Sequence, residues 1–492
     1  MPEHLLTNKI HGRVSQPVEG ETSRQMPDQV GNVAGADTEE LSERLLRTEP
    51  SPKFTKGPLE KVYAFWLSGM SCDGCTISTL GATEPSIEEL LTGSLPGVPM
   101  LVLHHYATSM DSGDHFTHSL EKAEKGELDA PYVIIYEGSI PDENLTAEGE
   151  PWAAEGSYPL WAPGEERRRV PTAEWVRRLA PGAAASIAIG TCATWGGIPA
   201  SDGNPTGSMS MMDFLGKDYR SAYGLPVINV PGCAPLGDNF TETVTLLLLF
   251  LNKQTPLPEF DELGRPEWLF DETVHRHCPR AGYYEEGTFA KGYDEPGGPK
   301  ECLVEVGCWG PTVNCNITER GAVGHLGGCM VAGGPCIGCT MPGFPDKFTP
   351  FYEVPPGSSV STTMSRLVGS FVIPLRRMTQ LERNREPRWQ DRVPSGWARE
   401  YDTTTLTHQA VEYFYDKLQY FRKERPGRQK DVEKYRSGYV TPAEAAYGEN
   451  YHKKLPDRRA EIARERGAPQ RQGLTPQTAG FETPPPGHEE EE

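Results

Sequence analysis

Eleven cysteines and one histidine are the residues of this chain whose types and spacing could do chemistry. Four cysteines lie far apart, as one Cys-x-x-Cys pair and two single residues: Cys72, Cys75, Cys192 and Cys233. The other seven fall within residues 278–339, and His275 lies three positions before the first of them. Thiolate sulfur and imidazole nitrogen are ligands of zinc and of iron–sulfur clusters. The pattern therefore predicts metal binding.

An iron–sulfur cluster usually has four protein ligands, most often thiolates and occasionally a histidine. Eleven cysteines and His275 make three such sets. Chain order suggests the following division: Cys72, Cys75, Cys192 and Cys233; His275, Cys278, Cys302 and Cys308; Cys315, Cys329, Cys336 and Cys339. Three zinc sites fit the same count, so a zinc-stabilised scaffold protein is an alternative. The wide spacing of the first set favours clusters, because zinc ligands usually come as two local pairs.

The start of the chain bears on location and on cysteine chemistry. The first thirty residues contain neither the apolar segment of a secretory signal nor a twin-arginine pair. The longest apolar run, residues 244–251, is shorter than the ~20 residues that span a bilayer. We therefore expect a cytoplasmic protein without a transmembrane segment, with peripheral membrane association as an option. In a reducing compartment these cysteines are not expected to pair as disulfides.

A net charge of −21 argues against a nucleic-acid surface.

The elements that must position the first four thiols are short apolar runs separated by segments long enough for crossovers. These runs begin at the opening stretch, residues 61–75, and continue at residues 98–104, 131–136, 184–190 and 225–230. Helices are expected over residues 86–92, 118–125, 172–179 and 241–251. The pattern predicts an α/β fold with a flavodoxin-like, doubly wound parallel sheet. Because ligands bind outside the carboxyl ends of such strands, the four thiols should converge at one edge.

Composition divides the chain into four parts. Residues 1–57 are polar and read as a disordered or draped arm, and residues 58–252 form the flavodoxin-like domain. Residues 253–348 are rich in Pro, Gly and Cys, and we expect an irregular domain whose folding depends partly on bound metal. Residues 349–492 form an extension in contact with partner subunits, with Pro-rich loops, a helix over residues 403–423 and a disordered end.

The motifs around the ligands resemble those of the small, electron-transferring subunit of a nickel-iron hydrogenase. The resemblance covers residues 58–348 and includes Cys72-x-x-Cys75, Glu137-Gly-Ser-Ile-Pro, Pro231-Gly-Cys-Ala-Pro, His275-x-x-Cys278 and Cys336-Ile-Gly-Cys339. It implies a proximal set (Cys72, Cys75, Cys192, Cys233), a medial set (Cys315, Cys329, Cys336, Cys339) and a distal set (His275, Cys278, Cys302, Cys308). It also implies a large subunit that carries the nickel-iron centre, so no catalytic residue lies in this chain.

Departures from the family pattern refine this expectation. Many relatives have proline at the position of Cys329 and a three-iron medial cluster, so we expect three [4Fe–4S] clusters here. Oxygen-tolerant relatives have two extra cysteines at the positions of Gly74 and Gly197. Because this chain has glycine at both positions, that mechanism of tolerance is excluded. The missing export signal and long extension resemble actinobacterial-type, high-affinity hydrogenases. A higher oligomer of the heterodimer is expected, with an unknown acceptor, a quinone or a redox protein.

Two carboxylates have alternative roles. Asp73 could ligate the proximal cluster in place of a thiolate, or it could cap backbone N–H groups in its turn. Glu137 could be structural, or it could help to move protons at the subunit interface. Among electron-transfer functions, the alternative is a complex-I-like or quinone-reductase iron–sulfur subunit. Such subunits resemble only the half of the chain that contains the proximal set.

Overall fold

The computed structural model describes residues 58–108, 114–146, 150–158, 168–201, 203–216, 219–261, 263–293, 301–324, 326–355 and 358–379. The predicted arm over residues 1–57 and the predicted helix over residues 403–423 lie outside the described residues.

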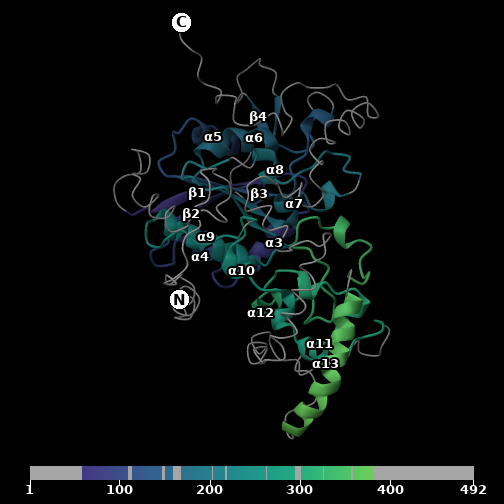
Figure 1. The fold of residues 1–492 in the computed structure, drawn as a ribbon. Helices are drawn as coiled ribbons and strands as arrows, with labels where there is room; N and C mark the ends of the chain where they lie inside the picture. Colours follow the sequence, from purple (N-terminus) through teal and green to yellow (C-terminus); the bar gives the residue numbers. More distant parts are fainter. Residues whose placement is uncertain are drawn as a thin grey trace, which may run out of the picture.

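A five-stranded parallel sheet forms the centre of the first domain (Figure 1). Its strands are β1 (Lys61–Ser68), β2 (Met100–His105), β3 (Tyr132–Glu137), β6 (Ala185–Ile189) and β7 (Val227–Val230), in the order β2-β1-β3-β6-β7. All neighbouring strands pair in parallel. Each predicted strand is present, and the flavodoxin-like sheet predicted from the sequence is confirmed.

The two faces of the sheet are covered by different helices, which is why the strands are apolar throughout. Side chains of α4 (Ile87–Thr92) and α9 (Gly237–Leu251) pack with one face in a core that includes Val62, Trp66 and Phe240. Side chains of α5 (Asp114–Glu124) and α6 (Thr172–Leu179) pack with the other face in a core that includes Phe65 and Leu67. Successive residues of β1 alternate between the two cores, as the pleat requires.

The predicted helices are present, although two begin earlier than expected, at Asp114 and Gly237. Ser86 begins α4 with a capping box that involves Glu89. Within the sheet domain, three short helices were not predicted, namely α3 (Gly74–Leu80), α7 (Gly190–Trp195) and α8 (Met211–Leu215). An antiparallel hairpin of β4 (Ala154–Tyr158) and β5 (Arg168–Pro171) was also not predicted. These elements are too short for a clear hydrophobic period, so contacts rather than sequence pattern define them.

Between residues 253 and 355, the described residues contain short helices and turns but no strand of a sheet. The helices are α10 (Glu267–Phe270), α11 (Ala281–Glu285) and α12 (Ile317–Arg320), with 3₁₀ turns that include η5 (Val274–His277) and η6 (Leu303–Val306). Figure 1 shows this part below the sheet. Its hydrophobic core includes three thiols, those of Cys278, Cys308 and Cys336. The predicted irregular character of this region agrees with the structure.

The expectation of loops from residue 344 to the helix at 403 is wrong in part, because α13 (Ser358–Thr379) is a 22-residue helix. Its first half packs on α11 and η6, and Ser361, Thr362 and Ser365 are buried. Serine and threonine favour turns in isolation, so this stretch resembled a loop. Among the helices of the described residues, none combines the length and the apolar character that crossing a membrane requires.

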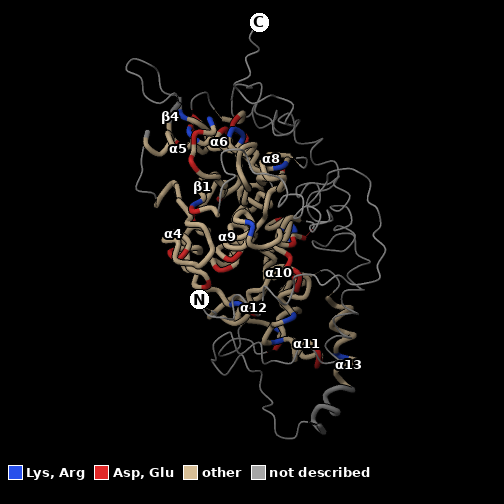
Figure 2. The backbone as a smooth tube through the Cα atoms, turned by 90° about the vertical axis from the view of Figure 1, so that its left-hand side faces the viewer, with Lys and Arg blue, Asp and Glu red and all other residues tan. Residues whose placement is uncertain are grey.

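Charged residues are scattered over the described chain rather than sorted by sign. Figure 2 shows Lys and Arg interspersed with Asp and Glu, without a continuous basic stripe. Nucleic-acid binding depends on such clusters of Lys and Arg facing the phosphates. The distribution therefore agrees with the conclusion drawn from net charge.

Candidate metal centres

The proximal thiols come from the ends of three strands. Cys72 lies in the turn after β1 and Cys75 in the first turn of α3, while Cys192 lies in α7 after β6 and Cys233 follows β7. Burial raises the pKa of the Cys75 thiol, and the charges of Glu137 and of the other three cysteines raise it further. The structure therefore brings together the four residues that the sequence assigned to this set.

Two glycines provide space for these thiols because they have no side chain. A Cβ atom at Gly190 would lie 2.3 Å from Cys75 Sγ, and one at Gly197 would lie 2.7 Å from Cys192 Sγ. Both residues have positive φ, 83° and 57°, which side chains rarely adopt. Gly197, one of the positions that carry an extra cysteine in oxygen-tolerant relatives, therefore has no room for a side chain here.

Glu137 is fully buried at the end of β3 and is the centre of a hydrogen-bond network. Its Oε1 accepts from Ser71 Oγ and from the Cys75 backbone N–H, both at 3.1 Å. Its Oε2 accepts from Trp66 Nε1 at 3.1 Å and from Thr76 Oγ1 at 2.5 Å. Four donors therefore point at the two oxygens of this one buried carboxyl group. The network ties the Cys-x-x-Cys turn to the sheet.

Asp73 has a different partner from the one expected for a capping residue. It is the N-cap of α3, with φ of 60°, but its side chain makes no capping hydrogen bond. Its Oδ1 accepts a hydrogen bond of 2.5 Å from the Tyr106 hydroxyl. The capping alternative is therefore wrong. The sequence interpretation missed Tyr106 and also Trp66 and Thr76, because nothing local in the sequence marks residues that meet only in the folded chain.

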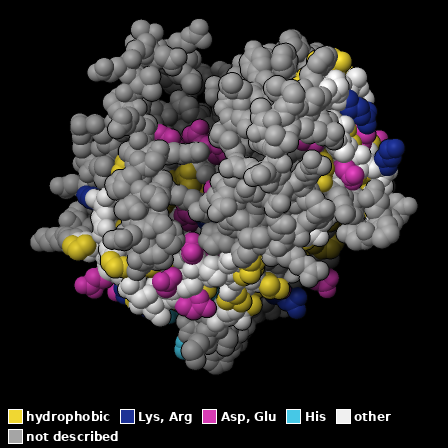
Figure 3. Space-filling view, turned by 90° about the horizontal axis from the view of Figure 1, so that it is seen from below, with side chains coloured by type: hydrophobic (Ala, Val, Ile, Leu, Met, Phe, Trp, Pro, Cys, Tyr) yellow, Lys and Arg dark blue, Asp and Glu magenta, His cyan; other side chains and the backbone are white. Residues whose placement is uncertain are grey.

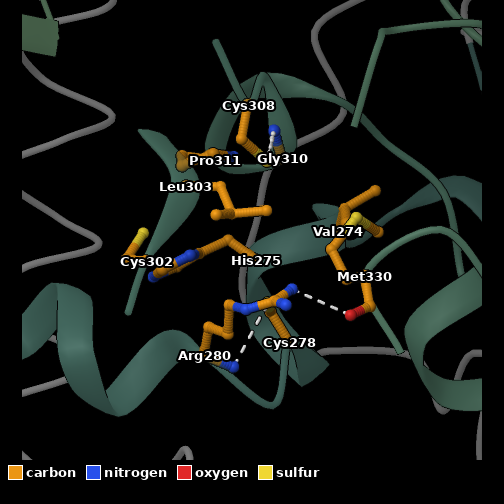
Figure 4. Close-up of a pocket in the computed structure, with 10 residues that line it drawn as sticks. All are labelled: Val274, His275, Cys278, Arg280, Cys302, Leu303, Cys308, Gly310, Pro311 and Met330. Atoms are coloured by element: carbon orange, nitrogen blue, oxygen red, sulfur yellow. Dashed lines mark hydrogen bonds between the residues drawn. The ribbon is translucent and has the colours of Figure 1, made fainter. Parts of the chain in front are cut away.

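The distal residues line one cavity (Figure 4). His275 lies in η5, Cys278 follows η5, Cys302 precedes η6, and Cys308 follows η6. All four are buried. Burial raises the pKa of the Cys278 thiol to about 12, and the charge of Cys308 adds to the shift. Arg280 and Met330 also line this cavity.

The medial thiols meet between the other two sets. Burial raises the pKa of Cys315 to about 12, with a contribution from the charge of Cys329. Burial also raises the pKa of Cys336, on which the charges of Cys339 and Cys315 act. Cys329 is the exposed member of the four. The structure thus brings together the four residues of this set as well.

Two contacts join the three sets in the order proximal, medial, distal. Burial raises the pKa of the medial Cys339 thiol, and the proximal Cys233 acts on it through a backbone hydrogen bond and through charge. Trp195 Nε1 donates to the Thr340 carbonyl at 3.0 Å, beside the same junction. At the other junction, the backbone N–H of the medial Cys336 donates to the distal Cys308 Sγ at 3.2 Å. The sets are therefore neighbours along one path.

The donor chemistry fits iron–sulfur clusters. A buried thiol loses its proton only if a nearby positive charge stabilises the thiolate, and cluster iron supplies that charge. Within the described ranges, no three His, Cys, Asp or Glu side chains are grouped closely enough to hold a single metal ion. Four thiol or imidazole side chains in each set are the number of ligands that an iron–sulfur cluster usually has.

Two different family models match the two parts of the fold, the sheet domain and the cysteine-rich region. Residues 72–247 match the family model of the NADH ubiquinone oxidoreductase 20 Kd subunit, and residues 270–352 match the C-terminal family model of the NiFe/NiFeSe hydrogenase small subunit. The periplasmic [NiFeSe] hydrogenase small subunit of Desulfomicrobium baculatum is 33% identical over 298 residues, which are 60% of this chain and 87% of the relative. The chain belongs to the family of nickel-iron hydrogenase small subunits.

Solved structures agree with this assignment. An actinobacterial-type NiFe-hydrogenase from Ralstonia eutropha H16 is 44% identical, with a TM-score of 0.62 over 69% of this chain and 96% of that chain. The [NiFeSe] hydrogenase of Desulfomicrobium baculatum is 33% identical, with a TM-score of 0.51 over 60% and 99%. This small subunit is thus the electron-transfer partner of a large subunit that holds the catalytic site, and small subunits of this family carry iron–sulfur clusters. The match beyond residue 270 decides against the complex-I-like alternative.

Proposed function

We propose that this small subunit passes electrons from hydrogen oxidation in the large subunit to an external acceptor through three [4Fe–4S] clusters. The single observation that carries the proposal is the pair of junctions between sets, Cys233 with Cys339 and Cys336 with Cys308. These junctions link three groups of four ligands in one series that starts at the sheet edge. Bound clusters supply one-electron transfer, and the chain supplies ligands, spacing and the surrounding charges.

The proposed ligands are the three sets named above, within a flavodoxin-like domain over residues 58–252 and a cluster domain over residues 253–348. Glu137 is proposed as a positioning residue, since its four hydrogen bonds fix the turn that carries Cys72 and Cys75. The proton-transfer role stays a prediction. The same holds for Asp73 as a cluster ligand, with one carboxylate oxygen bonded to Tyr106.

The contact surface for the large subunit is proposed to lie beside the proximal set. Helix α3, which carries Cys75, exposes Ile77 and Leu80 by 66% and 56%. Val323, which is 52% exposed, lies beside Gly81 at the end of the same helix. Exposed apolar side chains that gather near a redox centre suit a permanent partner. Figure 3 shows the molecule from below, where hydrophobic side chains lie among acidic ones.

Similarity to the Ralstonia eutropha enzyme supports a hydrogenase of the actinobacterial type. We further propose that the enzyme has a high affinity for hydrogen and a cytoplasmic location. The extension at residues 349–492 is proposed to contact partner subunits. A quinone or a redox protein is the proposed acceptor class. Relatives described as periplasmic exist, so the location needs its own measurement in fractionated cells.

Purification of the chain with its native partners tests the proposal. We expect a nickel-containing subunit to co-purify, and about twelve irons per small subunit if three four-iron clusters are bound. The visible absorbance should bleach on reduction. A colourless preparation with about three zinc ions and little iron would contradict the proposal and favour the zinc-stabilised scaffold.

The medial assignment has a separate test, the substitution Cys329→Pro. It should convert one four-iron centre into a three-iron centre that is paramagnetic when oxidised. Electron paramagnetic resonance and iron analysis would detect the new signal and the loss of about one iron. An unchanged iron count would show that Cys329 is not a ligand. Ala332→Ser, at an exposed position three residues away, is the matched control.

A further inference from the structure

Arg280 is a buried cation in the wall of the distal cavity. The residue is 2% exposed and directly precedes α11. Its Nη1 donates to the Met330 carbonyl at 2.8 Å, and its backbone N–H donates to Cys278 Sγ at 3.4 Å (Figure 4). Met330 follows the medial Cys329 in the chain. The arginine therefore contacts both the distal set and the segment that carries a medial ligand.

The charge of this side chain acts on several distal ligands at once. Burial is the main cause that raises the pKa values of Cys278, Cys302 and Cys308, and the positive charge of Arg280 acts in the opposite direction on all three. A guanidinium stays protonated in proteins, so this charge is permanent. Burial also limits its screening by water and salt.

The proximal set has the opposite kind of neighbour. The carboxylate of Glu137 is fully buried and accepts a hydrogen bond from the backbone of Cys75, and its charge raises the pKa of that thiol. A cluster gains one negative charge when it is reduced. A buried cation beside it therefore favours the reduced form, and a buried anion disfavours it.

We propose that Arg280 is a tuning residue that raises the reduction potential of the distal cluster and so favours electron flow away from the proximal site. The proposal rests on the distal ligand assignment of the proposed function. Arg280 touches no reacting hydrogen species and acts through the cluster that its neighbours hold. The opposite charges of Arg280 and Glu137 give the series of centres a direction that suits hydrogen oxidation.

The test compares Arg280→Gln, which keeps a hydrogen-bond donor but removes the charge, with Arg280→Lys, which keeps the charge. The assembled hydrogenase is titrated with redox mediators, and the paramagnetic signal of each reduced cluster gives its midpoint potential. We expect Arg280→Gln to weaken the preference of the distal centre for the reduced form about tenfold, or about 59 mV for one electron. Arg280→Lys should retain most of the wild-type value.

Arg366→Gln is the matched control. Arg366 lies in α13 near the same region, but its side chain is 53% exposed and is paired with Glu305 at 2.6 Å. Its removal should leave the distal potential unchanged. An unchanged distal potential in iron-loaded Arg280→Gln, or equal shifts in the glutamine and lysine variants, would overturn the proposal.

Iron analysis covers the case in which a variant does not load. Loss of the distal iron in Arg280→Gln, with retention in Arg280→Lys, would support a requirement for a cation at this position. Loss in both variants would overturn the tuning role, because the shape of the guanidinium would then be what the site needs. The iron content of the wild-type enzyme tests the three-cluster assignment separately, so the two failures are distinguishable.

Discussion

The proximal set of thiols and the cysteine-rich region beyond residue 253 position their predicted ligands in different ways. At the proximal site, the thiols lie at the ends of strands whose positions are set by two apolar cores on the faces of the sheet. In the cluster domain, Cys278, Cys308 and Cys336 are themselves members of the core, together with residues such as Val274 and Phe344. The first site is added to a fold that has its own stability. In the second region, thiols that are predicted ligands are part of the packing.

The difference explains which interactions stabilise each region. Burial of apolar side chains contributes ~25 cal/mol per Å², and the sheet domain buries long runs of Val, Ile and Leu. The cluster domain has short helices and no described strand, so less apolar area is available to it. Bound metal contributes folding free energy where a preformed core is small. Three predictions would break or sharpen this comparison.

Removal of iron should have the largest effect. After chelation, we expect amide hydrogen exchange within residues 270–352 to speed up ~100-fold or more, because the thiol core loses its cross-links. The amides of β1, β3 and β6 should change by less than about tenfold, since their hydrogen bonds lie in the sheet. Mass spectrometry of peptides from the two regions makes the measurement. Equal loss of protection in both regions would show that the sheet also depends on metal.

Substitution of Glu137 by glutamine should have an intermediate effect, confined to the proximal site. The amide nitrogen would face donors that now bond to a carboxylate oxygen, at a cost of about 1–3 kcal/mol. We expect the iron of one cluster to become labile, while the other two clusters remain. Iron content and the proximal paramagnetic signal give the readout. Glu127→Gln at an exposed position is the control, and full retention of proximal iron in Glu137→Gln would refute the positioning role.

Glu155 should give the smallest effect, a pH dependence that belongs to the sheet domain alone. Burial raises its pKa from 4.5 to about 8, and its Oε1 accepts from the Ser68 backbone N–H at 3.0 Å. The unfolded chain loses this proton near pH 4.5 and the folded chain near pH 8. The free energy of unfolding should therefore fall as pH rises through this window, by about 2 kcal/mol or more, and then level off.

The substitution Glu155→Gln should remove that fall and stabilise the sheet domain above pH 8. Denaturant unfolding between pH 4.5 and 8.5, followed by a signal from the sheet domain, makes the measurement. Glu60→Gln at an exposed position should keep the wild-type slope. A wild-type slope in Glu155→Gln would mean that another group is responsible.

Much of the fold was predictable because its signals are local. The five strands are continuous apolar runs, and α6 begins and ends at the predicted residues, Thr172 and Leu179. The short helices α3 and α7 were not predicted, although each carries a thiol, because six or seven residues show no clear period. Helix α13 was missed because the buried side chains in its first part, residues 358–370, are serine and threonine rather than apolar residues.

The sequence by itself determined the family and predicted the ligand types and their division into three sets, because these depend on residue identity and on order along the chain. Only the tertiary structure decided the neighbours of those ligands. Glu137 meets Cys75 from 62 residues away, and Arg280 meets Met330 from 50 residues away. Such contacts depend on how separate elements pack, and no local pattern encodes them. The charges that distinguish the proximal from the distal site belong to this second class.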